Sequence, residues 1–385
     1  MTSARLEPAH AVFGLRTPNL GDDLQALAVA TISPYVSTLI NRERIGWRQV
    51  SEPHVFVMNF WFMSKGYRWA PHETICPIFH GFCIGRDEVL QYRWVDYLRR
   101  HQPIGCRDEH SVELLKAKGI EAFWTGCVTL FLARYVEPTP PEQRKGVLFV
   151  DVPPEAEALI PDDIKSRAER LTNTCPPSIR DDPLARFARI AAITDRLRYA
   201  ELVVTRRLHT ALPCIGFQTP FVLTMSNQWR DLRRFSGYQD FIPRLQYGPG
   251  ESGGNISWHD VKPVTPLPEQ EVYFEKLLEG LKAVFGSVNE RKSPVFACRN
   301  RFRIPNPGLG EMPGMARIRL GAKDVIRLPQ RWSDSFVDLE VEGFAGFERF
   351  DVPIELQGFK QRQWTPAGRL REFSVGNVPL DAAVP

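Results

Sequence analysis

The chain has 385 residues, of which 43% are hydrophobic and 24% charged, and its formal net charge is +4 at pH 7. This length and apolar content are enough for two domains with their own cores, and they argue against a disordered chain. The small net charge and the absence of a Lys/Arg-rich run with interleaved aromatics argue against nucleic acid as a partner.

The cysteines and apolar segments indicate a cytoplasmic protein. Seven cysteines are scattered without a CxxC pair, which is typical of buried free thiols in a reducing compartment. The N-terminus MTSARLEPAH lacks the apolar run of a signal peptide. The longest apolar stretch, VFVMNFWFM, is far shorter than the ~20 residues that span a bilayer. We therefore expect at most peripheral contact with the inner face of a membrane.

Strand-like runs alternate with helical patterns in the first part of the chain. The predicted strands are AVFGL, HVFVMNF, ICPIFHGF, PIGC and AFWTG, and the predicted helices are 22–32, about 86–100 and 108–118. This alternation is typical of parallel sheets built from βαβ units. The proline-rich segment 137–146 predicts a hinge. Residues 1–136 are therefore expected to form an N-terminal Rossmann-like domain.

A second α/β series follows the hinge. It opens with the strand GVLFVDVP, continues through a helix at about 182–199, and closes with strands ELVVT and FVLTM and a helix at about 269–285. Apolar residues of the 182–199 helix recur at i, i+3, i+4 and i+7. We expect a second Rossmann-like domain over residues 146–290. Two such halves facing a cleft are the simplest assembly.

The composition changes after Cys298. Residues 299–329 hold seven Lys/Arg against two Asp/Glu, and VDLEVE at 337–342 alternates as a half-buried strand does. Residues 299–385 are therefore expected to form an appended, β-containing tail whose role the sequence does not indicate.

The first candidate loop is TPNLGDDLQALA, residues 17–28. Gly21 permits a tight turn after a strand, Asp22 is a good N-cap, and Gln25 has the spacing of a capping box. Helix initiation alone explains Asn19 and Asp22. The loop also follows a strand's carboxyl end, where open α/β sheets bind ligands.

The second candidate loop is PIGCRDEHSVELLKAKGI, residues 103–120. Asp108 is predicted to cap a helix, and Gly119 supplies the left-handed position at its end. Arg107 is not needed to start or end this helix. At a strand-to-helix junction its guanidinium suits a carboxylate or phosphate, and a surface or interdomain salt bridge is the alternative.

The third candidate loop is TRRLHTALPC, which follows the strand-like ELVV. A proline is tolerated in a first helical turn, which makes Thr210 the predicted N-cap. Arg206, Arg207 and His209 then precede a helix N-terminus, whose free N–H groups favour an anion. The pattern predicts a phosphate site with an imidazole that moves a proton near pH 7, and a structural histidine is the alternative.

The three loops occur together in a fixed order. Their landmarks are NxGD at Asn19 to Asp22, RDxxSxxLLxxxGI from Arg107, and RLH at 207–209 followed by xTP at 218–220. With these motifs the chain resembles the polysaccharide pyruvyl transferase family over residues 12 to about 285.

The resemblance implies an architecture like that of GT-B glycosyltransferases and phosphoenolpyruvate as the donor substrate. Pyruvate would be attached as a ketal to two hydroxyls of a sugar in a polysaccharide, such as an exopolysaccharide, or in its lipid-linked oligosaccharide precursor. Arg207 and His209 would contact phosphoenolpyruvate in the second domain, and Arg107 would help to hold the anion. Four further loop residues would bind the substrate: Asn19, Gly21, Arg206 and Thr210.

The chain departs from the family pattern at three positions. Arg206 replaces an acidic residue before RLH, and Thr210 replaces a small residue after it. Arg230, in NQWRDLRRFSGY, lies where the family often has a lysine and is expected to bind substrate in its place. These changes leave the acceptor specificity open.

The expected mechanism needs an acid and a base. We expect His209 to protonate the methylene carbon of phosphoenolpyruvate, and Asp22 or Asp23 to take a proton from the sugar hydroxyl. No metal or other cofactor is expected, since the eight histidines form no ligand-spaced cluster with acids or cysteines.

Two other functions fit the same sequence. A GT-B glycosyltransferase would use the Arg/His loop to hold the diphosphate of a nucleotide sugar. A non-catalytic glycan-binding protein would use its nine tryptophans and basic tail for carbohydrate contacts. Protection by a nucleotide favours the first, and glycan binding that survives loss of Arg207 and His209 favours the second.

Overall fold

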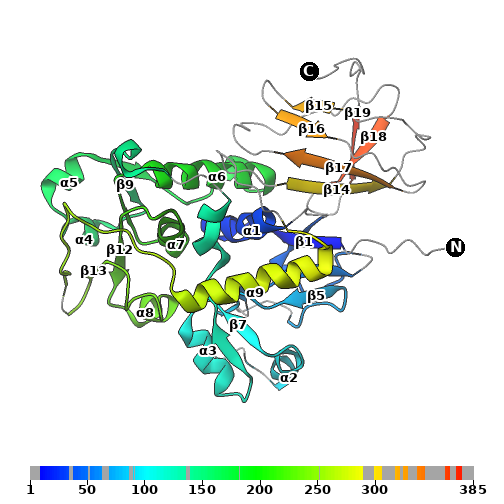
Figure 1. Ribbon diagram of the computed structural model, residues 1–385, viewed down its shortest axis with the longest axis horizontal. Helices are drawn as coiled ribbons and strands as arrows, with labels where there is room; N and C mark the ends of the chain where they lie inside the picture. The colour runs from blue at the N-terminus through cyan, green and yellow to red at the C-terminus, as the bar shows by residue number, and fades with distance from the viewer. Residues whose placement is uncertain are drawn as a thin grey trace.

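The fold is described from a computed structural model. It describes residues 9–33, 38–50, 53–62, 69–85, 90, 92–135, 139–181, 183–250 and 252–288, and six strands beyond them. Figure 1 shows the arrangement of the elements. The predicted α/β class with parallel sheets is confirmed.

The first half of the chain forms a four-stranded parallel sheet in the order β2-β1-β3-β5. Its strands are β1 (Ala9–Gly14), β2 (Thr38–Asn41), β3 (His54–Val57) and β5 (Ile75–Ile78). Two short parallel pairs follow, β4 (Trp61–Phe62) with β6 (Cys83–Ile84) and β7 (Ile104–Cys106) with β8 (Ala122–Trp124). Three helices accompany them, α1 (Leu20–Ile32), α2 (Tyr92–Arg100) and α3 (Glu109–Lys116).

The second half forms a five-stranded parallel sheet in the order β10-β9-β11-β12-β13. Its strands are β9 (Val147–Val150), β10 (Ala168–Leu171), β11 (Leu202–Thr205), β12 (Phe221–Ser226) and β13 (Arg244–Tyr247). The three central strands are buried at every position, as expected for strands that are covered on both faces. Its helices are α4 (Pro154–Glu157), α5 (Asp162–Ser166), α6 (Pro183–Tyr199), α7 (Leu208–Phe217), α8 (Trp229–Arg234) and α9 (Pro268–Phe285).

The two halves share one hydrophobic core. A single cluster of buried side chains runs from β1 and α1 through the 3₁₀ segment η3 (Val128–Arg134) to α6 and α7. Helix α1 of the first half packs against α6 and α7 of the second. Alternate residues of β9 and β11 point into a separate cluster on the other face of the second sheet. The N-terminus of α1 is thereby fixed beside the second sheet.

Helix α1 begins earlier than the sequence predicts. Its N-cap is Asn19 and not Asp22, because the Asn19 side chain accepts a hydrogen bond from Gly21 N at 3.2 Å. Asn is as good a cap as Asp, and the earlier start places Asp22 and Asp23 at the positive end of the helix dipole. The predicted capping box is also wrong, since the buried Gln25 amide has no hydrogen-bond partner.

Helix α7 also begins before the predicted cap. Arg207 occupies the N-cap position without a side-chain cap, and its carbonyl accepts from the N–H groups of Thr210 and Ala211, each at 3.0 Å. Thr210 is therefore inside the helix, and its prediction as the N-cap is wrong. His209 departs from helical geometry, with φ −80° and ψ 22°. Pro213, four residues later, has no N–H to donate to the His209 carbonyl, which explains the kink.

The strands described beyond residue 288 are antiparallel. Four form a sheet in the order β14-β17-β16-β15 and two form the pair β18-β19, which agrees with a β-containing tail. Their bounds are β14 (Arg299–Pro305), β15 (Arg317–Leu320), β16 (Asp324–Arg327), β17 (Phe336–Glu342), β18 (Lys360–Trp364) and β19 (Leu370–Ser374). The predicted strand 337–342 lies in β17.

Two further expectations concern the burial of the cysteines and the presence of membrane-spanning helices. Of the cysteines in the described part, Cys76 is exposed, and the others, Cys83, Cys106, Cys127, Cys175 and Cys214, are buried and free. The expectation of buried thiols is therefore wrong for Cys76, which lies on an edge strand, and Cys298 is outside the described residues. Within the described ranges, no helix is long and apolar enough to cross a membrane.

Candidate functional site

The first and third candidate loops meet at the carboxyl edge of the second sheet. Strands β9 and β11 are parallel neighbours, so Asp151 and Arg206 both follow strand ends at this edge. The segment after β10 joins them to α1, because Asn173 O accepts from Leu20 N and Pro18 O accepts from Cys175 N, each at 2.8 Å. Residues that are far apart in the sequence thus surround one site.

Gly21 lies directly against His209. A Cβ atom at Gly21 would lie 3.2 Å from His209 Cβ, which is closer than most Cβ contacts, and 3.6 Å from its Nδ1, an ordinary van der Waals contact. The glycine therefore permits the start of α1 to approach the start of α7. A glycine is needed here because of this close approach and not because of the backbone conformation, since the φ angle of Gly21 is not positive.

His209 is an almost buried imidazole without a partner on Nε2. Its exposed fraction is 7%, and Nε2 makes no hydrogen bond. Burial holds the pKa of His209 well below its ordinary value, and the positive charges of Arg107 and Arg234 lower it further. The imidazole is therefore neutral at pH 7, and its buried Nε2 keeps an unused hydrogen-bonding position.

Arg207 forms an ion pair at the same edge. Its Nε donates to Asp151 Oδ2 at 2.7 Å, and Asp151 also accepts from Thr172 Oγ1 at 2.6 Å and from Asn173 N at 3.1 Å. Asp151 has φ +52°, a left-handed conformation that is uncommon for a residue other than glycine. The neighbouring Arg206 is exposed and has no partner among the described residues.

Asp151 and Asn173 are site residues that the sequence reasoning missed. Asn173 Nδ2 donates to Thr210 Oγ1 at 2.9 Å, while its buried Oδ1 has no partner. The predicted substrate residue Thr210 is fully buried and serves this contact. An acid directly after the apolar strand VLFV was a usable signal for Asp151, whereas nothing local marks Asn173.

The two acids in the first turn of α1, Asp22 and Asp23, divide between the site and the core. Asp22 accepts from Asn19 Nδ2 at 3.0 Å and from Thr17 Oγ1 at 3.2 Å, and its side chain keeps 17% exposure. Asp23 is fully buried, and both its oxygens accept from Arg186, at 2.6 and 2.9 Å. Burial raises the pKa of Asp23, and Arg186 opposes that rise. Asp22 therefore lies at the site edge and Asp23 faces the core.

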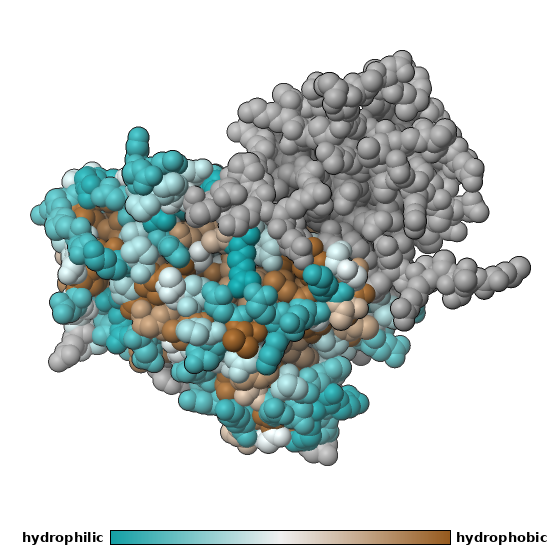
Figure 2. Space-filling view, viewed as in Figure 1, coloured by the Kyte–Doolittle hydropathy of each residue, from teal (hydrophilic) through white to brown (hydrophobic). Residues whose placement is uncertain are grey.

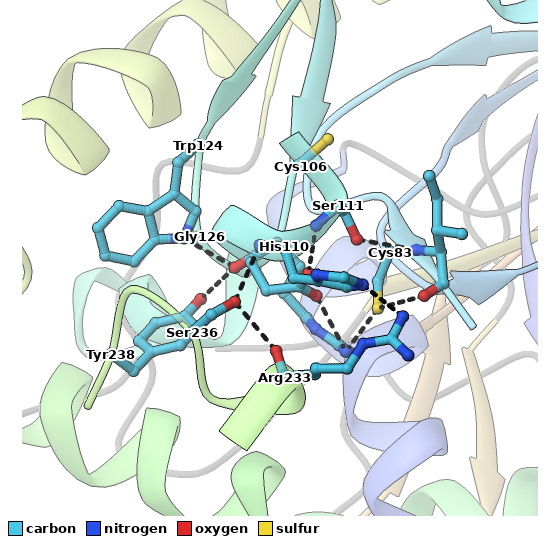
Figure 3. Close-up of polar contacts among 12 residues, drawn as sticks. Cys83, Cys106, His110, Ser111, Trp124, Gly126, Arg233, Ser236 and Tyr238 are labelled. Carbon is cyan, nitrogen blue, oxygen red and sulfur yellow. Dashed lines mark hydrogen bonds and ion pairs between the residues drawn. The ribbon is translucent and has the colours of Figure 1, made fainter. Parts of the chain in front are cut away.

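Arg107 lies at the second loop, and its immediate surroundings are drawn in Figure 3. Its side chain is 4% exposed, and Nη2 donates to Cys83 Sγ at 2.8 Å and lies 3.4 Å from Asp108 Oδ2. The Nε atom is buried without a partner. The positive charge of Arg107 lowers the pKa of His209, which links the second loop to this imidazole electrostatically.

Arg230 lies in α8, and its side chain is outside the described residues. Arg234, at the end of that helix, was not singled out from the sequence, and its charge reaches His209. One arginine from each half, Arg107 and Arg234, thus lowers the pKa of His209, and positive charge of this kind suits an anionic ligand. Among the residues described here, no group of three or more His, Cys, Asp or Glu is placed to hold a metal ion.

The comparison with family models agrees with this site. The model described as Polysaccharide pyruvyl transferase matches residues 61–228. Over this range the chain is similar to the polysaccharide pyruvyl transferase family. The predicted resemblance is thus confirmed, and the family indicates a transferase enzyme.

The pyruvyl transferase match covers two of the three loops. It includes Arg107 and the segment from Arg206 to Thr210, and it ends before Arg230. The NxGD loop lies outside the match and reaches the site through its contact with His209. No curated protein matches the chain significantly.

Proposed function

We propose that the protein transfers the pyruvyl group of phosphoenolpyruvate to two hydroxyls of a sugar, in a polysaccharide or its lipid-linked precursor, as a cyclic ketal. The observation that carries this proposal is the buried imidazole of His209, with Nε2 unpartnered, among arginines from both halves. The family match supports the donor and the reaction class.

The donor anion is held by guanidinium groups. Phosphoenolpyruvate carries a phosphate and a carboxylate, and arginine binds both groups through paired N–H donors. In the proposal Arg207, Arg206 and Arg230 bind from the second half, and Arg107 binds from the first. The positive end of the α1 dipole, beside Gly21, adds a favourable electrostatic contribution.

His209 supplies a proton only after the donor binds. The imidazole is neutral in the empty site, and an adjacent anion favours its charged form. The imidazolium then protonates C3 of phosphoenolpyruvate, which leaves a cation at C2 that one sugar hydroxyl attacks. The C2–O bond to phosphate breaks, and the second hydroxyl closes the ketal.

The protons of this reaction balance without an external acid. The two sugar hydroxyls release two protons. One restores the proton that the His209 imidazolium gave to C3, and the other leaves with the phosphate. Asp22 takes the first hydroxyl proton as the general base, since it keeps solvent contact. Asp23 is not assigned this role because its side chain is fully buried in an ion pair with Arg186.

The proposal also retains the expected division of the chain. Residues 1–136 and 146–290 are assigned as two Rossmann-like domains in a GT-B-like arrangement, with the donor site mainly in the second. Residues 299–385 are assigned as an appended tail. A cytoplasmic location, with peripheral contact at the membrane's inner face, fits an acceptor that is a lipid-linked oligosaccharide.

Thermal shift with three ligands tests the function. Phosphoenolpyruvate, a UDP-sugar and inorganic phosphate are each added to the wild type, to Arg207→Ala and to Arg196→Ala. Arg196 is a matched control, because it pairs with Glu169 on the surface of α6. A ligand at 100 times its Kd adds about 2.7 kcal/mol of stability.

We expect phosphoenolpyruvate to stabilise the wild type and the control but not Arg207→Ala. Stabilisation by the UDP-sugar alone would reject the pyruvyl donor and favour a glycosyltransferase. No stabilisation by any ligand, together with glycan binding that survives loss of Arg207, would favour a non-catalytic glycan-binding protein.

A further inference from the structure

The main chain of Arg107 is hydrogen-bonded on both sides. Its N–H donates to Phe82 O at 2.9 Å. Its carbonyl accepts two bonds, from Trp124 Nε1 at 2.8 Å and from Tyr238 Oη at 2.9 Å. Both lone pairs of the carbonyl are therefore used. Figure 3 shows the Trp124 and Tyr238 side chains converging from two different segments.

Tyr238 reaches Arg107 from the second half of the chain. The side chain is fully buried, and its ring meets the Trp124 ring edge-on, with the centroids 5.3 Å apart. The preceding Gly237 has φ +84°, and a Cβ there would lie 2.8 Å from Trp124 Cζ2. Only glycine fits this turn, so the chain is shaped locally to deliver the tyrosine hydroxyl.

The segment that carries Tyr238 is fastened to the start of α3. Ser236 Oγ accepts from His110 N at 2.9 Å and donates to Arg233 O at 3.0 Å, and the Arg233 guanidinium contacts His110 Nε2. These contacts are visible in Figure 3. We name residues 233–238 the α8 clasp, since they run from the last residues of α8 and hold the loop that contains Arg107.

The guanidinium of Arg107 is anchored separately. Its contacts with Cys83 Sγ and Asp108 Oδ2 use Nη2 and leave the buried Nε without a partner. An arginine binds an anion more tightly when its backbone is already fixed, because ordering a mobile segment on binding costs free energy. The clasp supplies this fixation from the opposite half.

We propose that Tyr238 is a positioning residue, whose hydroxyl holds the Arg107 carbonyl so that the guanidinium meets the donor anion in one orientation. This inference rests on the proposed function. Burial raises the pKa of Tyr238 well above its ordinary value, so the hydroxyl remains a donor over the whole physiological range. The same clasp joins α8, which contains Arg230, to the Arg107 loop, and the two halves of the donor site are thereby held together.

Phosphoenolpyruvate affinity in a double-mutant cycle tests the role of the hydroxyl. Tyr238→Phe keeps the ring and removes only the Oη donor. By calorimetry we expect this variant to raise the Kd for phosphoenolpyruvate roughly three- to tenfold, the effect of one net hydrogen bond. In an Arg107→Ala background the same substitution is expected to change the Kd less than about twofold, because coupled residues are not additive.

Tyr97→Phe is the matched control. Tyr97 is also nearly buried, at 8% exposure, but its hydroxyl has no partner and lies away from the Arg107 loop. This control is expected to leave the Kd unchanged. A threefold or greater effect of Tyr238→Phe that persists in Arg107→Ala overturns the proposal, and so does an unchanged Kd in Tyr238→Phe.

A second measurement separates this inference from the proposed function. Hydrogen exchange of the peptide 103–112 is expected to be faster in Tyr238→Phe than in wild type and in Tyr97→Phe, without any ligand. If the wild type fails to bind phosphoenolpyruvate, the proposed function fails, and the cycle is repeated with inorganic phosphate. Unchanged exchange in Tyr238→Phe rejects the positioning role whatever the ligand.

Discussion

Asp23 of α1 and Arg186 of α6 form a two-pronged ion pair in which neither side chain is exposed. Arg186 Nη1 also contacts Cys175 Sγ at 2.9 Å, so the guanidinium is held on a second side. The pair joins the helix that begins at the site to a helix of the second half. The pair is structural in position, although the expected mechanism named Asp23 as an alternative general base to Asp22.

Removal of one partner of the Asp23–Arg186 ion pair is predicted to lower the stability of the protein strongly. Asp23→Ala leaves an unpaired buried guanidinium and is expected to lower the free energy of unfolding by about 3–5 kcal/mol. Glu169→Ala is the control, since Glu169 pairs with Arg196 on the surface and its loss costs about 0–1 kcal/mol. Urea denaturation measures both. Equal losses in the two variants would contradict the structural role of the buried pair.

The conformation of Asp151 leads to a second prediction. Asp151→Ala and Asp151→Gly both remove the acceptor of Arg207, but only alanine retains the steric cost of a left-handed backbone at φ +52°. The glycine variant is therefore expected to be more stable than the alanine variant by about 1 kcal/mol. Chemical denaturation of the two variants makes the comparison.

An ordinary helical position provides the control for Asp151. Glu279 is exposed within α9, where glycine is less stable than alanine by about 1 kcal/mol. The order of the two substitutions is thus expected to reverse between positions 151 and 279. The same order at both positions would show that backbone strain at Asp151 has no effect on stability.

Much of the fold was predictable from apolar patterns, and the exceptions share a cause. The central strands β9, β11 and β12 are continuous apolar runs, because both of their faces are covered. In the two larger parallel sheets, the strands that the patterns did not indicate, β2, β10 and β13, all lie at sheet edges. Edge strands are short and carry polar residues, as AERL in β10 does, so no apolar run marks them.

The candidate site was predictable in its motifs but not in its partners. The motifs containing Gly21 and His209 indicated two loops that the structure brings into contact. The partners of Arg107 and Asp23 are 131 and 163 residues away in the chain. Local spacing carries no information on such contacts, because they depend on how the two halves pack.

The buried His80 predicts a loss of stability in acid. Burial lowers the pKa of His80 to about 3, so between pH 6.5 and 3 the unfolded chain binds a proton that the folded protein does not. Its contribution to stability is complete above pH 6.5 and is lost as the pH falls. In this window His80 is expected to contribute a slope of about 1.4 kcal/mol per pH unit.

Comparison with His80→Phe isolates this contribution. The imidazole Nε2 has no partner and the ring faces Phe274 edge-on, so an apolar ring is a reasonable replacement. Urea denaturation between pH 7 and pH 5 is expected to show a smaller acid loss in the variant than in the wild type. Parallel pH profiles would mean that His80 is protonated as readily in the folded protein as in the unfolded chain.

Proton uptake on donor binding tests the proposed role of His209. The imidazole is neutral in the free protein because burial, Arg107 and Arg234 lower its pKa, and a bound anion is expected to reverse this shift. Calorimetry at pH 7.5 in two buffers of different ionisation enthalpy is expected to show uptake of about 0.5 to 1 proton per phosphoenolpyruvate bound. His209→Asn is expected to remove this uptake, whereas His259→Asn, at an exposed position, is expected to retain it. Binding without proton uptake in the wild type would leave His209 neutral beside the donor, and the proton for C3 would then have to come from another group.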